Sequence, residues 1–439
     1  MTKEEKYSIA KWAMEHAVKN GAQQARVSIY NNNSSEIEVR EEKIDKLQES
    51  NRNGMRINLY VNKKYSSIST NRLTDKEELG RFIEEAIAGT KYLAEDEFRT
   101  LPDPELYYKG EGPELKTIDK DFASIDPQQK INDAFAMEKE VLGSDERIIS
   151  VTASYRDGMS GSVMVASNGF EGDTENSYYS LSASVSVTDG DARPRGNWYE
   201  SSIFSDQLIR EGIGKKAMKR ALDRLGQEKI ASGRMPMIVE NKQAGRALSP
   251  IIQALNGSAI QQKQSFLIDM IGEKIGSDLM TITDDPFIVS GRGSRLFDGE
   301  GMATKKRSVI ENGVLKTYFI DTYYGKKLGM EPNSGSTTNL VFKPGEKELE
   351  GLLAEIDRGI LVTGFNGGNS NPVTGDFSYG IEGFLVEKGK LVQPVAEMNI
   401  TGSYKQLWKD LVAVGSDVDP SRSWRLPSLV FDNVDFSGI

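Results

Sequence analysis

Apolar positions near the start of the chain recur at the spacing of one helical face. They are Ile9, Trp12, Ala13 and Ala17, and His16 lies at the same helical spacing. Thr2 and Glu5 precede them with the spacing of a capping box, so a helix should begin at Thr2. From Ala25 to Thr70 the apolar positions recur every second residue, which predicts an antiparallel β-meander with Asn and Gly turns. A second capping box, Thr74 to Glu77, predicts that another helix follows.

Residues 99–121 are rich in proline, glycine and charge, and they form the best linker candidate in the chain. Beyond them, a helix is expected from about Pro127 to Leu142. Stretches with β pattern follow, separated by glycine turns, at residues 148–158, 161–169 and 178–190. A long helix is then expected from about Asp206 to Leu225.

The last part of the chain begins with an apolar stretch, Gly233 to Asn241, that is typical of a buried strand. A helix around Arg246 to Leu255 and a glycine-rich β region follow it. We therefore predict a multidomain α+β protein with antiparallel β-meanders, flanking helices and a Gly-rich β C-terminal domain. The predicted units are an N-terminal α+β domain (1–110), a central α+β segment (111–230) and a C-terminal β-rich domain (231–439).

Composition removes several kinds of catalytic site. The 439 residues include no cysteine and one histidine, His16. Disulfides, thiolate nucleophiles and Cys-ligated zinc are therefore excluded. Sites of the Ser-His-Asp and His-Glu-x-x-His types would all depend on His16, which lies four residues after Trp12 on the first helix. We interpret His16 as a packing residue, because a lone imidazole does not make a zinc site.

The net charge of −10 argues against direct nucleic acid binding, which needs clustered Lys and Arg. Two local basic clusters are interpreted as a solvated helix face and a strand end: Lys215-Lys216 with Lys219-Arg220, and Lys305-Lys306-Arg307. No apolar stretch approaches the roughly 18 residues that span a bilayer. The first residues also lack the apolar core of a signal peptide. We expect a cytoplasmic protein without a membrane segment.

Carboxylate chemistry stays open as an alternative. Asp284-Asp285 precede a proline, and Asp298 and Glu300 lie in the stretch RLFDGEG, so these groups could bind a hard cation such as Mg²⁺ or Ca²⁺. Ordinary acidic turn residues have the same pattern, and we favour that interpretation. Thr2 could become an N-terminal nucleophile once Met1 is removed, but its position as a helix cap explains it better.

The stretch NPVTGDFSYGIEGFLVEKGK, residues 371–390, combines glycines with aromatic residues at strand spacing. Lys388-Gly389 should turn the chain back into the next strand, so the stretch predicts a hairpin. Its glycines permit turns with positive φ or the close approach of another backbone. A β-edge that captures an extended peptide needs such geometry. A purely structural hairpin is the alternative.

These residues carry a family resemblance. The segment GGNSNPVTGDFSYGIEGFLVEKGKLVQPVAEMNITGSYKQLWKDLVAVGSD resembles the C-terminal signature of the TldD/PmbA family, once regarded as modulators of DNA gyrase and now as peptidase components. It is most similar to the PmbA (TldE) branch. The resemblance extends upstream through RLFDGEGMATKKRSVIENGVLKTYFIDTYYGKKLG, and more loosely to VREEKIDKLQESNRNGMRINLYVNKKYSSISTNRL in the first unit.

The resemblance implies a division of labour between two subunits. In this family a TldD-type subunit holds a metal, expected to be zinc, on a His-Glu-x-x-x-His helix and a later cysteine. The matching positions here fall near Ser249, Pro250 and Ala254, and the C-terminal stretch supplies no cysteine. The resemblance thus implies a metal-free subunit that is not catalytic alone. It would pair with a TldD-like partner and act on unfolded or leader peptides, such as microcin precursors and antitoxin proteins.

Within this chain, the resemblance and the hairpin pattern together assign a peptide cleft or subunit interface to six residues. They are Asn369, Asn371, Asp376, Tyr379, Gly380 and Gly383. Two alternatives stay open. One is a stand-alone peptide-binding or regulatory homodimer without proteolytic activity. The other is an independent hydrolase that uses Asp298 and Glu300 with a hard cation.

Overall fold

The computed structural model describes residues 1–439, and its first half is built on one long antiparallel sheet. The strand order is β3-β2-β1-β4-β5-β6. The strands are β1 (Gln24–Arg40), β2 (Lys43–Val61), β3 (Lys64–Thr70), β4 (Ile148–Ala166), β5 (Glu171–Val187) and β6 (Arg195–Ser202). The central pair, β1 with β4, stays in register from Arg26↔Ala166 to Arg40↔Thr152. The predicted segments 1–110 and 111–230 therefore share one sheet.

Strand β4 differs from its prediction. It runs without a turn through the two stretches that were expected to be separate, and Gly158 and Gly161 lie inside it. Gly158 packs under a cross-strand ring, because a Cβ there would lie 2.4 Å from Cε1 of Tyr178. The glycine thus makes room for an aromatic side chain and does not turn the chain. The turn comes later, at Gly169, where φ is +107°.

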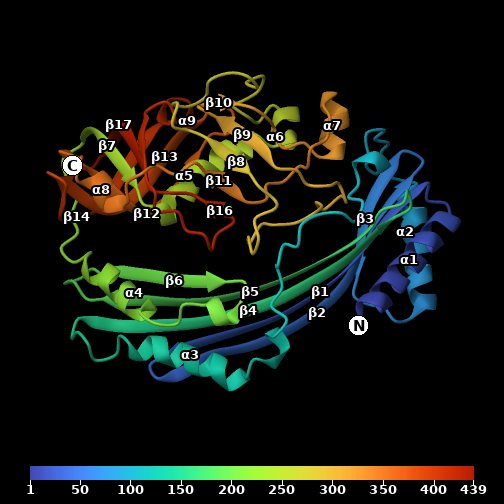
Figure 1. Cartoon of the computed structure of the whole chain (residues 1–439), viewed down its shortest axis with the longest axis horizontal. Helices are drawn as coiled ribbons and strands as arrows, with labels where there is room; N and C mark the ends of the chain where they lie inside the picture. The colour runs from blue at the N-terminus through green and yellow to red at the C-terminus, as the bar shows by residue number, and fades with distance from the viewer.

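Four helices cover one face of this sheet, two at each end (Figure 1). They are α1 (Lys3–Lys19), α2 (Lys76–Thr90), α3 (Pro127–Lys139) and α4 (Ile213–Leu222). Apolar residues of α1 and α2 pack with Val27 and Ile29 of β1, and those of α3 and α4 pack with Ile37 and Val39. These β1 positions are all odd-numbered, so the face of the sheet that carries the even-numbered residues of β1 is free of these helices.

The helix ends confirm some predictions and correct others. Thr2 and Glu5 form the expected capping box of α1. The cap of α2 is Asp75, not Thr74, because the Asp75 carboxylate accepts from the N–H groups of Glu77 and Glu78. Helix α4 is shorter than expected, since Gly212 at φ +80° marks its start and only a 3₁₀ turn, Ser205–Gln207, precedes it. Further 3₁₀ turns, Pro104–Leu106 and Phe122–Ser124, lie in and beside the predicted linker.

The C-terminal domain contains a second, six-stranded sheet of order β14-β13-β12-β7-β17-β15, in which β14 also pairs with β17. Its strands are β7 (Gly233–Val239), β12 (Arg358–Ser370), β13 (Asp376–Glu387), β14 (Lys390–Ser403), β15 (Leu411–Val414) and β17 (Leu429–Ser437). The β7–β12 pair is parallel and the others are antiparallel. The predicted hairpin is present as β13–β14, with Lys388 and Gly389 at φ +49° and +75°.

A smaller sheet and short helices complete this domain. The sheet has the order β10-β9-β8-β11-β16 and comprises β8 (Ile282–Asp284), β9 (Arg307–Glu311), β10 (Val314–Leu315), β11 (Leu340–Phe342) and β16 (Trp424–Arg425). The helices are α5 (Asn241–Ala254), α6 (Gly257–Gln261), α7 (Thr322–Leu328), α8 (Leu349–Leu353) and α9 (Tyr404–Leu407). The largest apolar core, which includes Trp408, Phe342 and Phe431, lies in this domain.

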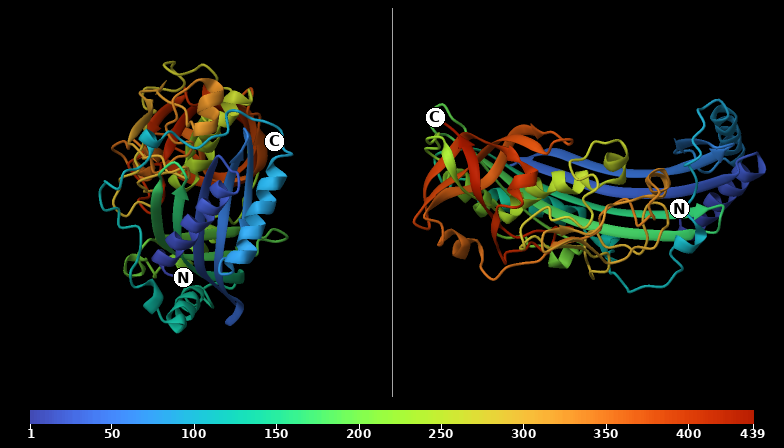
Figure 2. Two further views of the ribbon diagram at one scale, coloured as in Figure 1. Left: turned by 90° about the vertical axis from the view of Figure 1, so that its right-hand side faces the viewer. Right: turned by 90° about the horizontal axis from the view of Figure 1, so that it is seen from above.

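The C-terminal domain lies over the long sheet, on the side away from α3 (Figure 1). Seen from above, the long strands curve from beneath the C-terminal sheet at one end to α1 and α2 at the other (Figure 2). The two parts touch near both ends of the sheet: Arg220 pairs with Glu240 at one end, and Phe170 packs on Phe297 at the other. The architecture confirms the predicted α+β class. None of the helices has both the length and the apolar character that a membrane crossing needs.

Candidate functional site

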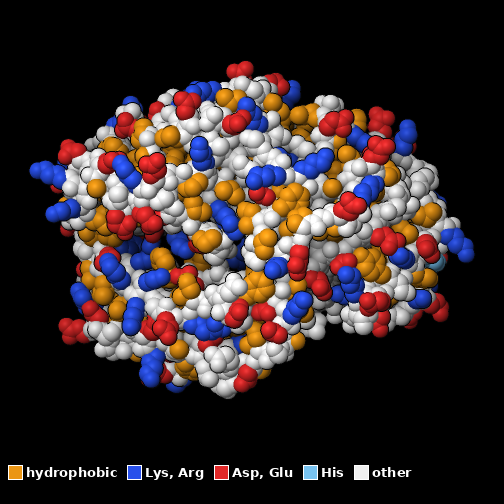
Figure 3. Space-filling view, viewed as in Figure 1, with side chains coloured by type: hydrophobic (Ala, Val, Ile, Leu, Met, Phe, Trp, Pro, Cys, Tyr) orange, Lys and Arg blue, Asp and Glu red, His pale blue; other side chains and the backbone are white.

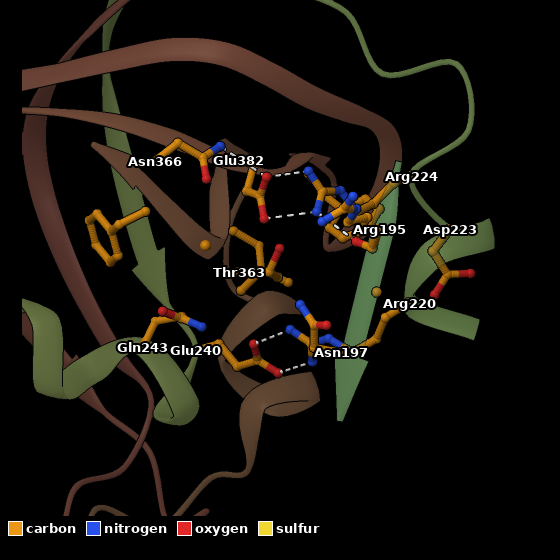
Figure 4. Close-up of a pocket in the computed structure, with 15 residues that line it drawn as sticks. Arg195, Asn197, Arg220, Asp223, Arg224, Glu240, Gln243, Thr363, Asn366 and Glu382 are labelled. Carbon is orange, nitrogen blue, oxygen red and sulfur yellow. Dashed lines mark hydrogen bonds and ion pairs between the residues drawn. The ribbon is translucent and has the colours of Figure 1, made fainter. Parts of the chain in front are cut away.

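A cavity of about 370 Å³ lies where the edge of the long sheet meets the C-terminal domain. Residues of β6 and the end of α4 form one wall, and residues of β12, β13 and the start of α5 form the other. Only three of its lining residues are apolar. Figure 4 shows Glu240 and Glu382 pointing across toward Arg220 and Arg224. The cavity is thus polar and is framed by charged pairs from the two parts of the chain.

Two double hydrogen-bonded ion pairs bridge the walls. Both Nη atoms of Arg220 donate to the Glu240 carboxylate at 2.7 Å. Arg224 donates to both oxygens of Glu382, with Nη1 2.8 Å from Oε1. The Glu240 carboxylate raises the pKa of Arg220 above its ordinary value, although burial opposes the shift. Such forked pairs are stronger and more directional than single ones, so they fix the walls relative to each other.

Glycines let the walls approach. At Gly196 of β6, a Cβ would lie 2.2 Å from the carbonyl oxygen of Ala217 in α4. At Gly364 of β12, a Cβ would lie 2.4 Å from Oε1 of Glu382. Gly196 therefore allows α4 to lie directly on the strand, and Gly364 leaves space for the carboxylate that binds Arg224.

Helix α5 leads from the cavity into the C-terminal domain. Its buried face is apolar, as at Ala244, Leu248 and Ile251. Its open face is polar and comprises Lys242, Gln243, Arg246, Ser249, Pro250 and Gln253. Lys242 lies 4.8 Å from the centre of the Tyr199 ring of β6, so this face looks toward the long sheet.

The positions matched to the family's metal ligands lie on α5. The Ser249 hydroxyl accepts a hydrogen bond from Nε2 of Gln253 at 2.8 Å. Pro250 lies inside the helix and Ala254 is buried in the core. Neither Pro250 nor Ala254 has a side-chain donor atom for a metal. The residues present therefore do not fit the metal that the family implies.

None of the six predicted hairpin residues lines the cavity. Asn371 and Asp376 organise the β12–β13 loop: Asn371 Oδ1 accepts from the N–H of Val373 at 2.9 Å, and Asp376 accepts from the Thr374 hydroxyl at 2.7 Å. Asn369 pairs with Ser378 across the two strands. These exposed residues therefore stabilise the turn between β12 and β13.

Tyr379, Gly380 and Gly383 lie deeper in the hairpin. A Cβ on Gly380 would lie 2.3 Å from the carbonyl oxygen of Asn366, and one on Gly383 would lie 1.8 Å from that of Leu361. Both glycines thus serve strand packing. Tyr379 is buried, hydrogen bonds through its hydroxyl to Tyr404 at 3.2 Å, and carries the Arg246 guanidinium over its ring at 5.3 Å. The assignment of these residues to a peptide cleft or interface stays a prediction.

Other sequence candidates have structural partners. The carboxylate of Asp284 bonds Arg307 at 3.0 Å, and Asp298 accepts from the N–H groups of Glu300 and Met302. Glu300 accepts from the N–H of Thr322 at 2.9 Å, and burial raises its pKa. No set of three or more His, Cys, Asp and Glu side chains is grouped to hold a metal ion.

The basic clusters and His16 also contact partners within the chain. Lys306 pairs with Asp285 at 2.8 Å, and Lys216 lies 3.3 Å from Glu200. His16 stacks on Trp12 with ring centres 5.0 Å apart and bonds Glu84 at 2.9 Å, as a packing residue would.

Sequence reasoning missed the residues that frame the cavity. Arg220 had been interpreted as a solvated helix face, and Arg224, Glu240 and Glu382 had no assigned role. Arg220 and Glu240 are 20 positions apart, and Arg224 and Glu382 are 158 positions apart, so no local pattern reveals these pairs. Arg246 did leave a signal, because it lies at helical spacing from Gln243 and Gln253 on the polar face of an amphipathic helix.

Known proteins are similar to this chain over nearly its whole length. Models of the PmbA/TldA metallopeptidase family match domain 1 at residues 25–89, the central domain at 120–225 and the C-terminal domain at 232–438. The Metalloprotease PmbA homolog of Haemophilus influenzae is 31% identical over 97% of this chain and 95% of its own length. Metalloprotease PmbA of Escherichia coli O157:H7 is 26% identical, covering 94% and 92%.

Solved structures agree with this relationship. A Bacteroides thetaiotaomicron protein, proposed as a modulator of DNA gyrase, is 52% identical with a TM-score of 0.98 over the full length of both chains. A Thermotoga maritima protein proposed for the same role is 25% identical with a TM-score of 0.88, covering 98% of this chain and all of the other. TldE of Thermococcus kodakarensis shares the fold, with a TM-score of 0.86, 22% identity, and coverage of 98% and 100%. The chain therefore belongs to the PmbA/TldD metallopeptidase family.

Proposed function

We propose that this chain is the metal-free, PmbA/TldE-like subunit of a two-component metallopeptidase, and that it holds unfolded or leader peptides for a TldD-like partner. The partner would supply the metal that activates water and polarises the scissile carbonyl. This chain would contribute a polar cleft and positioning contacts. The proposal places the complex in the cytoplasm.

One observation carries the proposal. Helix α5 begins at the polar cavity, which Gln243 lines, yet the positions matched to metal ligands are Ser249, Pro250 and Ala254. Ser249 is already bonded to Gln253, and the other two side chains offer no donor atom. A family member with a polar cleft but without ligand atoms fits a supporting role better than a catalytic one.

The test is proteolysis of an unfolded, fluorescently labelled protein by three samples: this chain alone, a TldD-like partner alone, and both mixed. Each sample is assayed with and without a chelator. We expect chelator-sensitive cleavage by the partner or the mixture, faster in the mixture, and none by this chain alone. In a further mixture, a partner lacking its metal-ligating histidines should be inactive.

Two other outcomes would contradict the proposal. Cleavage by this chain alone would indicate an independent hydrolase, and an Asp298→Asn variant of normal melting temperature would then test the carboxylate alternative. Peptide binding by this chain with no effect on cleavage in any mixture would favour the stand-alone binding homodimer.

A further inference from the structure

The seam between the long sheet and the C-terminal domain contains a second hollow besides the cavity at β6. It measures about 360 Å³ and lies between the helix-free face of the sheet, at Ser28 and Asn176, and the loop that carries Arg292 and Arg295. Figure 3 shows the molecule hollowed between its upper and lower parts, with both basic and acidic side chains around the opening. A segment bound in the seam would therefore meet both walls.

Several carboxylates at the seam already have partners. Glu240 and Glu382 pair with Arg220 and Arg224, and Asp419 bonds Lys242 at 2.7 Å. Asp298, in the second hollow, accepts from two backbone N–H groups. Glu240, Glu382 and Asp419 are therefore each offset by a cation of their own, whereas Asp298 keeps its charge and acts on Arg295.

Three arginines at the seam keep free guanidinium groups. The ion pairs engage Arg220, Arg224 and Lys242, and leave Arg195, Arg246 and Arg292 without a carboxylate partner. All three are exposed. Arg246 lies over the Tyr379 ring at 5.3 Å and Arg292 over the Tyr178 ring at 5.7 Å. An aromatic ring under a guanidinium limits its motion while its N–H groups stay available.

This excess of positive charge runs against the character of the whole protein, which carries a net charge of −10. Arginines without a carboxylate partner on such an acidic protein must be explained by the ligand that they contact. Arginine forks match carboxylates in geometry, and a partly enclosed seam strengthens such contacts relative to open solvent.

We propose that the seam binds polypeptide segments rich in aspartate and glutamate, whose carboxylates contact Arg195, Arg246 and Arg292. The inference rests on the proposed function, because it assumes that the ligand is a peptide, and it adds the chemical class of that peptide. The positive charge of these arginines would attract acidic segments to the seam and repel lysine-rich ones.

The test is fluorescence anisotropy with the purified full chain and three labelled twelve-residue peptides. One carries Asp and Glu in a Gly/Ser background, the second carries Asn and Gln at the same positions, and the third carries Lys. We expect the acidic peptide to bind about tenfold or more tightly than the amide peptide, and salt to weaken this binding. Arg246→Met and Arg292→Met should each weaken it several-fold. Arg81→Met, on the exposed surface of α2, is the matched control and should leave it unchanged.

Several outcomes would overturn the inference. Equal affinity for acidic and amide peptides would overturn it and leave the peptide-handling function standing. A loss at Arg81→Met as large as at Arg246→Met would mean that attraction is not localised at the seam. Displacement of the acidic peptide by an equally long oligothymidylate at equal concentration would point to nucleic acid instead. If no peptide binds and the mixture with a TldD-like partner shows no added cleavage, the proposed function fails as well.

Discussion

Arg224 and Glu382 lie 158 positions apart in the chain, yet the Arg224 guanidinium donates to both carboxylate oxygens of Glu382. Arg224 also donates to the carbonyl oxygen of Arg195, and Glu382 accepts from the Asn366 amide. The side chains of Arg224 and Glu382 are 17% and 18% exposed, so solvent screens them little. The pair therefore fixes β6 and α4 to the C-terminal sheet, and with them the width of the cavity.

Replacing Glu382 with alanine should lower the free energy of unfolding by about 2 to 3 kcal/mol, because Arg224 would keep a mostly buried charge without its partner. Urea unfolding measures the change. A double-mutant cycle with Arg224→Met should give a coupling energy of about 1 kcal/mol or more. The exposed pair of Arg358 and Glu387 is the control, and Glu387→Ala should cost less than about 0.5 kcal/mol. Equal losses at both sites would contradict a special role for the buried pair.

Gly383 separates a structural from a binding role for the predicted hairpin. A Cβ there would lie 1.8 Å from the carbonyl oxygen of Leu361, so Gly383→Ala should lower the melting temperature sharply by forcing β12 and β13 apart. Gly89→Ala in helix α2 has no atom within 4 Å of the added Cβ and should raise stability slightly, by about 0.5 to 1 kcal/mol. A Gly383→Ala variant with normal melting temperature but weakened peptide binding would instead assign this glycine to the cleft.

Local sequence patterns predicted those features that depend on neighbouring residues. The capping box of α1, the β1–β3 meander and the Lys388-Gly389 turn are all determined within a few positions. The continuous β4 strand was missed because the reason for Gly158, the ring of Tyr178, lies on the next strand. The joining of the first two predicted units into one sheet depends on β1–β4 pairing across more than a hundred residues, which no local period encodes.

The candidate site shows the same limit more strongly. The family resemblance pointed to the β12–β14 region and to α5, and that assignment stays a prediction. The cavity is framed by ion pairs that join Arg220 of α4 to Glu240, just before α5, and Arg224, just after α4, to Glu382 of β13. Charge alone cannot identify such partners, because a basic helix face in a sequence has the same appearance whether it is solvated or bridged. Only the tertiary structure distinguishes paired Arg220 from unpaired Arg246.

Asp419 should link stability to acid pH. Burial alone would raise the pKa of Asp419, but hydrogen bonds from Lys242 and the Ser421 hydroxyl outweigh it and hold the pKa below its ordinary value of 3.8. A carboxyl with a lowered pKa in the folded state contributes stability above pH 3.8, and this contribution is lost as the pH falls through the folded-state pKa.

We therefore expect Asp419→Asn to lower the free energy of unfolding by about 1 kcal/mol at pH 7, and the difference from wild type to shrink as the pH falls below 3.8. Urea unfolding at several pH values gives this difference directly. Asp278→Asn, at a highly exposed carboxylate paired with Lys274, should show no such pH dependence. A difference that stays constant with pH would mean that Asp419 acts through packing and not through its charge.

Tyr379 joins the predicted hairpin to the arginine that we assign to peptide carboxylates. Its hydroxyl lies 3.2 Å from that of Tyr404, and its ring lies under Arg246. Tyr379→Phe removes only the hydroxyl, so it should cost about 1 kcal/mol of stability and leave the affinity for acidic peptides unchanged. Tyr379→Leu also removes the ring, so Arg246 should lose its preferred position and the affinity should fall several-fold. Calorimetry for stability and anisotropy for binding separate the two effects.

If both variants bind acidic peptides like the wild type while Arg246→Met does not, then the ring contributes nothing to placing the guanidinium, and Arg246 binds carboxylates from solvent without a fixed orientation.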